Sequence, residues 1–379
     1  MKKEIIAIGL LVFSLLIMVG CKDSTDNQNT IDPNSNMPSQ MTWSVYEVGA
    51  SGYAEMSAVA NMITDVYGTN IRMLPSATGV GRMIPLRNGM ASIAKLGDES
   101  QFAFEGVQEF SSPNWGPQDL RAIWSPITHY GLGVKANEGI EKIEDLKGKR
   151  VPYFPGNSSV NVKTEALLAF GGLTWEDVEV VELTAYSGQA EALLQGRIDV
   201  VSGIPSASAF VEAESKEGIE WLVMDPDYKV GWDRVEEVAP YLFSEIRDDG
   251  AGMDGNTPLL GYGYSIVSYA DQENVKGVIR AIDENIEQLK STLSTGQYYA
   301  LEKVLTEPIG IPFHDETIEY FKEKGLWDEE KQAKNDALIE RSKRLREAWK
   351  QVKIEAREKG ISDDAFPEYW LERKEELVE

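Results

Sequence analysis

The sequence predicts an α/β protein of two domains with a hinge between them, and three observations support this prediction. The chain has 379 residues, whereas one domain usually holds about 100–200 residues. From Thr42 onward, short apolar runs alternate with helical segments and Gly-rich loops, a pattern typical of parallel strands joined by crossover helices. The pattern starts again at Tyr130, which indicates a second unit of the same kind.

The amino-terminal segment has the features of a signal peptide followed by a lipid-attachment site. Residues 5–19 form a nearly unbroken apolar run after Met1-Lys2-Lys3. A membrane-spanning helix needs about 20 apolar residues, so this shorter run fits a signal peptide. Met18-Val19-Gly20-Cys21 resembles a bacterial lipoprotein box, and Cys21 is the only cysteine. We therefore predict cleavage of residues 1–20 and lipidation of Cys21; the alternatives are an uncleaved short anchor and a buried cysteine.

Residues 21–41 are rich in Asn, Asp, Ser and Pro, a composition that predicts a flexible linker. A lipid on Cys21 would tether the folded body to the cell membrane through this linker. The predicted location is therefore extracytoplasmic, in the periplasm or on the outer face of the cytoplasmic membrane.

The first domain is expected to comprise residues 42–127 and 268–324. Met56, Val59 and Ile63 recur at helical spacing, and Gly89 has the position of a helix C-cap. The expected strands are residues 43–48, 70–75 and 91–96, and the expected helices are residues 54–67 and 82–88.

The second domain is expected over residues 128–267, including two hinge strands. Gly131 and Gly133 have the same spacing as Gly261 and Gly263, and we interpret these two glycine-bearing strands as the connections between domains. The alternative is that both are ordinary strands of a single sheet. The expected strands are residues 130–136, 151–154, 179–183, 198–203 and 261–267, and the expected helices are residues 160–170 and 187–194.

Residues 325–379 form a charged extension with a helical pattern. Leu338, Leu345, Trp349 and Val352 fit one helical stripe, and charged residues surround it. We expect this stripe to pack on the body of the protein; the alternative is a surface that docks a partner.

Charge and composition exclude several classes of function. The formal charge of −25 makes a positive nucleic-acid-binding surface hard to assemble. One cysteine and two histidines, His129 and His314, exclude a disulfide within the chain and a cysteine zinc cluster. Neither histidine lies near a nucleophile motif. We therefore expect a protein that is not an enzyme, with no cofactor, no metal and no nucleic-acid partner.

Four loops share one design, in which a strand ends, small polar residues and Gly follow, and a helix begins. In open α/β sheets, ligands bind where such loops gather at the carboxyl ends of the strands. The amino termini of helices favour anions there. The candidate ligand-binding residues are Ser51, Gly52 and Tyr53 in the first loop, Ser76, Thr78 and Gly79 in the second, Asn157, Ser158 and Ser159 in the third, and Gly203 and Pro205 in the fourth.

Arg82 follows the second loop directly, and its guanidinium is a candidate clamp for a carboxylate. The alternative is a solvent-exposed helix arginine. Aromatic residues are further candidates to line the cleft or to belong to the core: Tyr53, Trp124, Tyr130 and Phe154. No loop matches a dinucleotide-binding or P-loop motif.

The order of these motifs resembles the TAXI family of extracytoplasmic solute-binding proteins over residues 42–320. The resemblance depends on the lipobox, the Thr78-Gly79 loop, Leu146-Lys147-Gly148-Lys149-Arg150-Val151, and Gly203-Ile204-Pro205. It implies the two-domain, type II periplasmic-binding-protein fold. It further implies capture of a small organic anion of the amino acid or dicarboxylate class, such as glutamate or 2-oxoglutarate. The partners that it implies are the membrane subunits of a TRAP-type secondary transporter.

Three other functions are compatible with these residues. The same fold serves ABC importers, for example for a sulfonate-like anion. It also serves ligand sensors that report to a membrane receptor, in which case residues 325–379 would dock to the receptor. An enzyme built on this fold is the third alternative.

Overall fold

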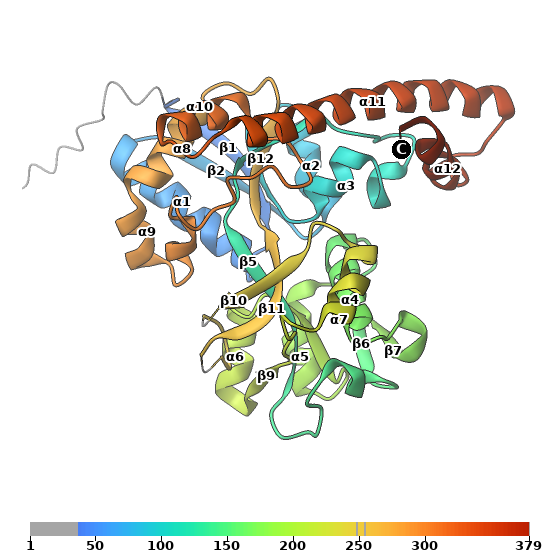
Figure 1. Ribbon diagram of the computed structural model, residues 1–379. Helices are drawn as coiled ribbons and strands as arrows, with labels where there is room; N and C mark the ends of the chain where they lie inside the picture. Colours follow the sequence, from blue (N-terminus) through green and yellow to red (C-terminus); the bar gives the residue numbers. More distant parts are fainter. Residues whose placement is uncertain (1–36, 248, 254, 379) are drawn as a thin grey trace, which may run out of the picture.

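The computed structural model describes residues 37–247, 249–253 and 255–378. The predicted signal peptide and the lipidation site Cys21 lie outside the described residues. Two α/β lobes make up the body, the larger one at the top of Figure 1 and the smaller one below it. The predicted fold class, two α/β domains with a hinge and a carboxyl-terminal helical extension, is confirmed.

The larger lobe is built on a five-stranded sheet in the order β2-β1-β3-β12-β4. Strand β1 pairs in parallel with β2 and β3, whereas β12 is antiparallel to β3 and β4. Trp43, Ser44 and Val45 of β1 are all fully buried, because helices cover both faces of this sheet. The strands are β1 (Gln40–Tyr46), β2 (Asn70–Ser76), β3 (Ile93–Leu96), β4 (Leu120–Trp124) and β12 (Ser265–Tyr269).

Two helices of the larger lobe, α2 and α10, begin at a side-chain cap. Helix α2 begins at Gly79, three residues before the predicted start at Arg82, because the Thr78 hydroxyl accepts a hydrogen bond from the amide of Gly81 at 3.0 Å. The second candidate loop is therefore shorter than predicted. The helices are α1 (Ser51–Tyr67), α2 (Gly79–Arg87), α3 (Glu99–Glu105), α8 (Val275–Glu284), α9 (Ile286–Thr292) and α10 (Asp315–Glu323), with short 3-10 turns η1 (Gln108–Ser111) and η5 (Gly296–Tyr299).

The smaller lobe has a sheet in the order β10-β11-β5-β8, with β9 also paired to β5. Strands β6 and β7 form a separate parallel pair. The strands are β5 (Ile127–Lys135), β6 (Arg150–Tyr153), β7 (Glu179–Glu182), β8 (Val200–Gly203), β9 (Ile219–Trp221), β10 (Phe243–Arg247) and β11 (Thr257–Gly263). The helices are α4 (Ser158–Phe170), α5 (Gln189–Leu194), α6 (Ser208–Glu217) and α7 (Lys229–Val238), with 3-10 turns η2 (Ile143–Leu146), η3 (Trp175–Asp177) and η4 (Tyr186–Gly188).

The hinge consists of two neighbouring chain crossings. The first leads from β4 to β5 through Ser125 and Pro126, and the second leads from β11 to β12 through Tyr264. The hydroxyls of Ser125 and Ser265 lie 2.8 Å apart, and the amide of Tyr264 donates to the carbonyl of Pro126 at 2.8 Å. These bonds hold the two crossings side by side.

The strand predicted over residues 261–267 is in fact two strands of different sheets. Gly261 pairs with His129 in the smaller lobe, whereas Ser265 pairs with Leu96 in the larger lobe. Residues 265–267, which the sequence analysis assigned to the second domain, therefore belong to the larger lobe's sheet. The two strands meet at Tyr264, whose amide still bonds to Pro126 in the register of the β5–β11 ladder, and from Ser265 onward the chain pairs with β3 and β4.

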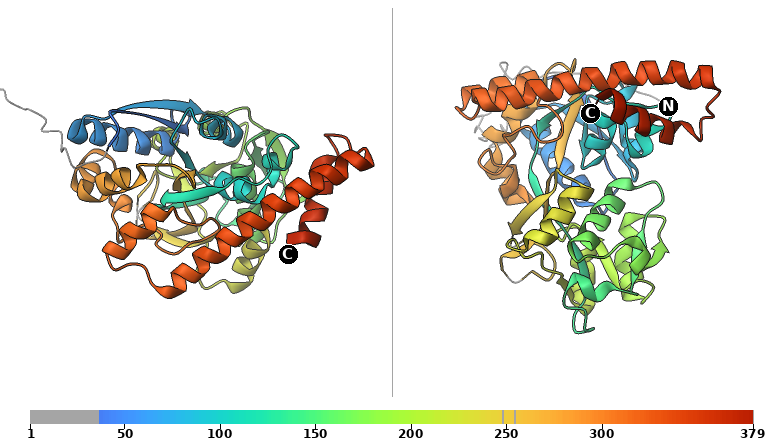
Figure 2. Two further views of the ribbon diagram at one scale, coloured as in Figure 1. Left: turned by 90° about the horizontal axis from the view of Figure 1, so that it is seen from above. Right: turned by 45° about the vertical axis from the view of Figure 1, so that its right-hand side comes forward.

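The carboxyl-terminal extension forms two helices, α11 (Glu329–Lys359) and α12 (Phe366–Val378). Figure 2 shows α11 running along the larger lobe and projecting past it, with α12 folded back. The rings of Trp349 and Trp370 pack edge to face at 4.8 Å, and Trp370 Nε1 donates to the carbonyl of Gly106 at 2.7 Å. The predicted helical stripe therefore packs on the body. Within the described residues, no helix is long and apolar enough to cross a membrane.

Replacing Trp370 by alanine is expected to destabilise the protein by about 3–5 kcal/mol, because it empties a buried site and leaves the Gly106 carbonyl unpaired. Urea unfolding measures this change. The control is Leu371→Ala at the neighbouring position, which is 43% exposed and should change the free energy of unfolding by less than about 0.5 kcal/mol. Equal losses in the two variants would contradict the packing described here.

Histidine 129 makes the stability of the fold depend on pH. His129 is fully buried on β5, and its burial, assisted by nearby Arg247, holds its pKa well below the usual value. The unfolded chain therefore takes up a proton near about pH 6.5, whereas the folded chain does not. The free energy of unfolding should fall as the pH drops below that value, by up to about 1.4 kcal/mol per pH unit.

His129→Gln should flatten this dependence between about pH 5 and pH 7 in urea unfolding experiments. His314, whose pKa burial also lowers, remains in the variant and keeps a residual slope. An unchanged slope in the variant would show that His129 is not the group responsible.

Candidate functional site

A cavity of about 40 Å³ lies between the two lobes, beside the hinge. Its walls come from the β1–α1 connection of the larger lobe, from the hinge region, and from the amino-terminal part of α4 in the smaller lobe. The lining residues are Tyr46, Glu47, Ala50, Ser51, Ala77, Glu99, Tyr130, Asn157, Ser159, Val160, Lys163, Tyr186, Ile204, Tyr262 and Tyr264.

Five tyrosines among these residues form what we call the tyrosine box: Tyr46, Tyr130, Tyr186, Tyr262 and Tyr264. The ring centroids of Tyr46 and Tyr264 lie 5.2 Å apart, and those of Tyr262 and Tyr264 lie 5.8 Å apart. Burial is the largest cause that raises the pKa of all five phenols. The box is therefore a wall of neutral rings and hydroxyls.

The hydroxyls of the tyrosine box differ in their hydrogen bonds. Tyr46 donates to Glu99 Oε2 and Tyr130 donates to the carbonyl of Ser202, both at 3.0 Å. Tyr186 accepts from the amide of Ile204 at 3.1 Å. Within the described part of the chain, the hydroxyls of Tyr262 and Tyr264 form no hydrogen bond, so both are available to a ligand.

Three buried cations contact the rings of the tyrosine box, Lys163 at the cavity wall and Arg82 and Lys95 behind it. Lys95 Nζ lies 4.1 Å from the ring centre of Tyr264. The guanidinium carbon of Arg82 lies 3.6 Å from the ring centre of Tyr46. Lys163 Nζ lies 4.6 Å from the ring centre of Tyr262. These cation–π contacts orient the rings.

Each of these cations is also paired with a carboxylate. Arg82 bonds to Glu99, Lys95 Nζ lies 3.0 Å from Glu55 Oε2, and Lys163 Nζ lies 2.8 Å from Asp98 Oδ2. Burial alone would raise the pKa of Glu99, but Arg82 and then Lys163 bring it below the usual value. The pairing is expected, because a buried charge without a partner is strongly destabilising.

The two lobes are closed onto each other around the cavity. Lys163 of α4 crosses the cleft to Asp98 of the larger lobe. The Ser158 hydroxyl donates to the carboxylate of Glu109, and the Ser208 hydroxyl donates to the carbonyl of Gly49 at 3.1 Å. Each of these bonds joins residues of different lobes.

The structure places three of the candidate ligand-binding residues at the cavity wall: Ser51, Asn157 and Ser159. Ser51 is 7% exposed, its hydroxyl has no partner, and α1 begins there without a side-chain cap. Asn157 caps α4, and the Ser159 hydroxyl accepts from Lys163 Nζ at 2.7 Å. Ser51 is therefore the candidate with a free hydroxyl at the cavity.

The predicted glycines accommodate protein side chains and do not line the cavity. A Cβ on Gly52 would lie 2.1 Å from the hydroxyl of Tyr264, and one on Gly203 would lie 2.4 Å from that of Tyr186. A Cβ on Gly79 would lie 2.7 Å from Cγ of Glu99. These glycines make room for the residues that form the wall, which corrects the direct ligand contacts predicted for them.

The clamp predicted for Arg82 is also corrected. Arg82 is fully buried, bonds to Glu99, and donates to the carbonyl of Ser76 at 2.9 Å. Its charge is already neutralised, and it does not line the cavity.

The other candidates outside the wall contact the protein itself: Thr78 caps α2, Ser158 bonds across the cleft, Tyr53 packs against the core, and Pro205 accepts from the amide of Ala251.

Sequence reasoning anticipated Tyr130 in the cleft but missed Lys163 and the other four tyrosines of the box: Tyr46, Tyr186, Tyr262 and Tyr264. Trp124 and Phe154, two further aromatic candidates, lie in the core. Tyr262 and Tyr264 lie at the crossing from β11 to β12, whereas Tyr46 ends β1 and Tyr186 lies in η4. A search for paired aromatics at the two lobe crossings, such as Tyr262-Gly263-Tyr264, would have found two of them.

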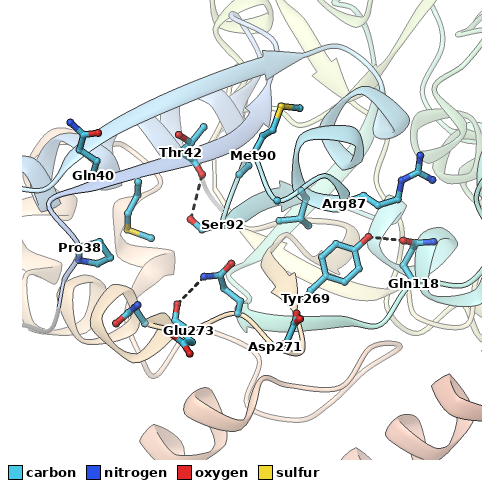
Figure 3. Close-up of a pocket in the computed structure, with 16 residues that line it drawn as sticks. Pro38, Gln40, Thr42, Arg87, Met90, Ser92, Gln118, Tyr269, Asp271 and Glu273 are labelled. Carbon is cyan, nitrogen blue, oxygen red and sulfur yellow. Dashed lines mark hydrogen bonds between the residues drawn. The ribbon is translucent and has the colours of Figure 1, made fainter.

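A second hollow, shown in Figure 3, lies on the larger lobe around the start of β1. Two of its polar side chains already have partners: the Tyr269 hydroxyl donates to Gln118 Oε1 at 2.5 Å, and Gln272 Nε2 donates to the backbone carbonyl of Glu273 at 2.9 Å. It lies on one lobe alone. In the described residues, no group of three or more His, Cys, Asp or Glu side chains is placed to hold a metal ion.

The model of the NMT1-like family matches residues 48–325. The periplasmic aliphatic sulphonate binding protein SsuA from Escherichia coli is 17% identical, with 76% of this chain and 94% of that chain covered and a TM-score of 0.41. An ancestral arginine-binding protein bound to arginine is 15% identical, with 69% and 99% covered and a TM-score of 0.42. The methionine binding protein MetQ is 16% identical, with 69% and 97% covered and a TM-score of 0.40.

Gly52→Ala is expected to destabilise the protein by about 1–3 kcal/mol, because the new methyl group collides with the Tyr264 hydroxyl. Removing that hydroxyl as well, in Gly52→Ala/Tyr264→Phe, should recover part of the loss, so the two changes should not be additive. Urea unfolding measures both effects. The matched control is Gly188→Ala, since a Cβ there meets nothing within 4 Å; a loss as large at Gly188 would refute the steric explanation.

Proposed function

The chain belongs to the NMT1-like family, and from this premise we propose that it is an extracytoplasmic solute-binding protein that captures a small organic anion. The observation that carries the proposal is the cavity between two lobes joined by a hinge, with donors from both lobes at its wall. Such clefts are the usual binding sites of two-lobed proteins. The function is binding without catalysis, and delivery of the solute to a membrane transporter.

The donors at the cavity favour an anion. Ser51 offers a buried hydroxyl without a partner at the start of α1, where the helix dipole is positive and no side chain caps the backbone amides. The hydroxyl of Tyr264 lies against this helix start, beside Gly52. Together these groups provide a place for one carboxylate of the ligand.

Ligand binding would favour the closed arrangement because the ligand contacts both lobes. Ser51 belongs to the larger lobe, whereas Asn157 and Tyr186 belong to the smaller one. A ligand can shift the hinge equilibrium only by its difference in affinity for the two states. Contacts with both lobes supply that difference, and transporters of this type would recognise the closed, loaded protein.

For the membrane partner, we propose a TRAP-type secondary transporter, with a lipid on Cys21 holding the binding protein at the membrane. The resemblance to the TAXI family supports this choice and supports glutamate, glutamine and 2-oxoglutarate as first test ligands. Uptake into vesicles that contain the cognate membrane subunits tests the partner. Uptake driven by an ion gradient supports a TRAP transporter, whereas a requirement for ATP would identify an ABC importer instead.

Ser51→Ala should weaken binding of the captured anion by about tenfold, the loss of one hydrogen bond to a charged group. Isothermal titration calorimetry of the full chain in mild detergent measures the change, using ligands first identified by thermal shift from carboxylates, sulfonates and neutral solutes. The control is Ser57→Ala on the same helix, where the hydroxyl donates to the carbonyl of Tyr53 and does not line the cavity. Binding that is equal in both variants would remove Ser51 from the site, and the absence of any anion that binds would overturn the proposal.

A further inference from the structure

We infer that the cavity between the lobes takes an aromatic monocarboxylate, and that Glu47 excludes ligands with a second carboxylate. This inference rests on the proposed function, because it names the ligand class of the same site. The proposed ligand differs from the dicarboxylates that the family resemblance implies. The reason is that the cations at and behind the cavity wall are already paired with carboxylates of the protein.

A second carboxylate on the ligand would find no unpaired cation. Lys163 is the cation at the wall, and it already bonds to Asp98 and to the Ser159 hydroxyl. Arg82 and Lys95 lie behind the rings and are paired with Glu99 and Glu55. To bind a dicarboxylate, the protein would have to break one of these pairs and leave a buried carboxylate alone, which is strongly unfavourable.

Glu47 adds a negative charge where the ligand body ends. It follows β1 and lines the cavity. In the described residues no lysine or arginine lies within salt-bridge distance of its carboxylate. A ligand carboxylate at this end would face the half-buried carboxylate of Glu47, and like charges repel.

The remainder of the cavity suits a flat, apolar body. Five tyrosine rings surround it, and Val160 and Ile204 complete the wall. Aromatic rings pack favourably edge to face or offset against another ring, beyond the gain from buried area alone. The free hydroxyls of Tyr262 and Tyr264 and of Ser51 then serve one polar group, so a single carboxylate on an aromatic body uses every free donor.

The test is calorimetric titration of the full chain with phenylacetate and phenylpyruvate against succinate and 2-oxoglutarate, with phenylacetamide as an uncharged probe. We expect the aromatic monocarboxylates to bind at least about tenfold more tightly than either dicarboxylate. Phenylacetamide should bind more weakly than phenylacetate by a similar factor. This comparison uses the unaltered protein, so its outcome does not depend on whether a variant folds.

Glu47→Gln should then improve the affinity for dicarboxylates by about tenfold while changing that for phenylacetate less than about threefold. The matched control is Glu220→Gln on β9, an exposed position that removes the same charge away from the cavity. If the control has the same effect as Glu47→Gln, net charge and not Glu47 sets the selectivity, and the role of Glu47 is overturned.

The outcomes separate the two proposals. Dicarboxylates that bind as tightly as the aromatic acids overturn the present inference, while the proposed capture of an organic anion stands. Phenylacetamide that binds as tightly as phenylacetate, with no carboxylate bound more tightly, overturns the capture of an anion as well.

Discussion

A charged group removed from water needs a partner, and this constraint shapes the cleft between the lobes. Arg82, Lys95 and Lys163 are each at most 2% exposed, and each is paired with its own carboxylate. The pairs hold the tyrosine rings in place and fix the elements that carry them. At the cavity wall, Lys163 and Glu99 are therefore already paired and Glu47 carries the unpaired charge, so the free donors there are hydroxyls of tyrosine and serine and not an arginine.

The sequence predicted the frame of the fold because strand–loop–helix order is a local property. Glycine spacing also located the hinge, since Gly131 and Gly133 lie in one crossing strand and Gly261 and Gly263 in the other. The break at Tyr264 was not predictable from the same pattern. An apolar run has the same pattern whether it belongs to one sheet or to two, and here residues 265–267 pair with β3 and β4, which are distant in sequence.

The candidate site was predicted less completely, for a physical reason. Ser51, Asn157 and Ser159 were found because loops at the carboxyl ends of strands lie at one edge of a sheet. The role of Gly52 was mistaken because a glycine leaves space without indicating what fills it, and Tyr264, distant in sequence, fills it here. Arg82 was mistaken because its partner Glu99 lies on another helix, and pairing across elements has no signature in a single sequence.

The carboxyl-terminal extension is compatible with movement of the hinge. Its buried contacts are with the larger lobe: Trp370 bonds to Gly106 after α3, and Arg341 Nε lies 2.7 Å from Glu105 Oε1. The bonds that hold the cleft closed come instead from α4 and α6 of the smaller lobe. Because the extension is attached to one lobe and the closing bonds arise from the other, opening would break the bonds of Lys163, Ser158 and Ser208 without disturbing α11 or α12. The hydrogen bonds that oppose opening therefore lie across the cleft between the lobes, and a ligand that contacts both lobes would add further ones.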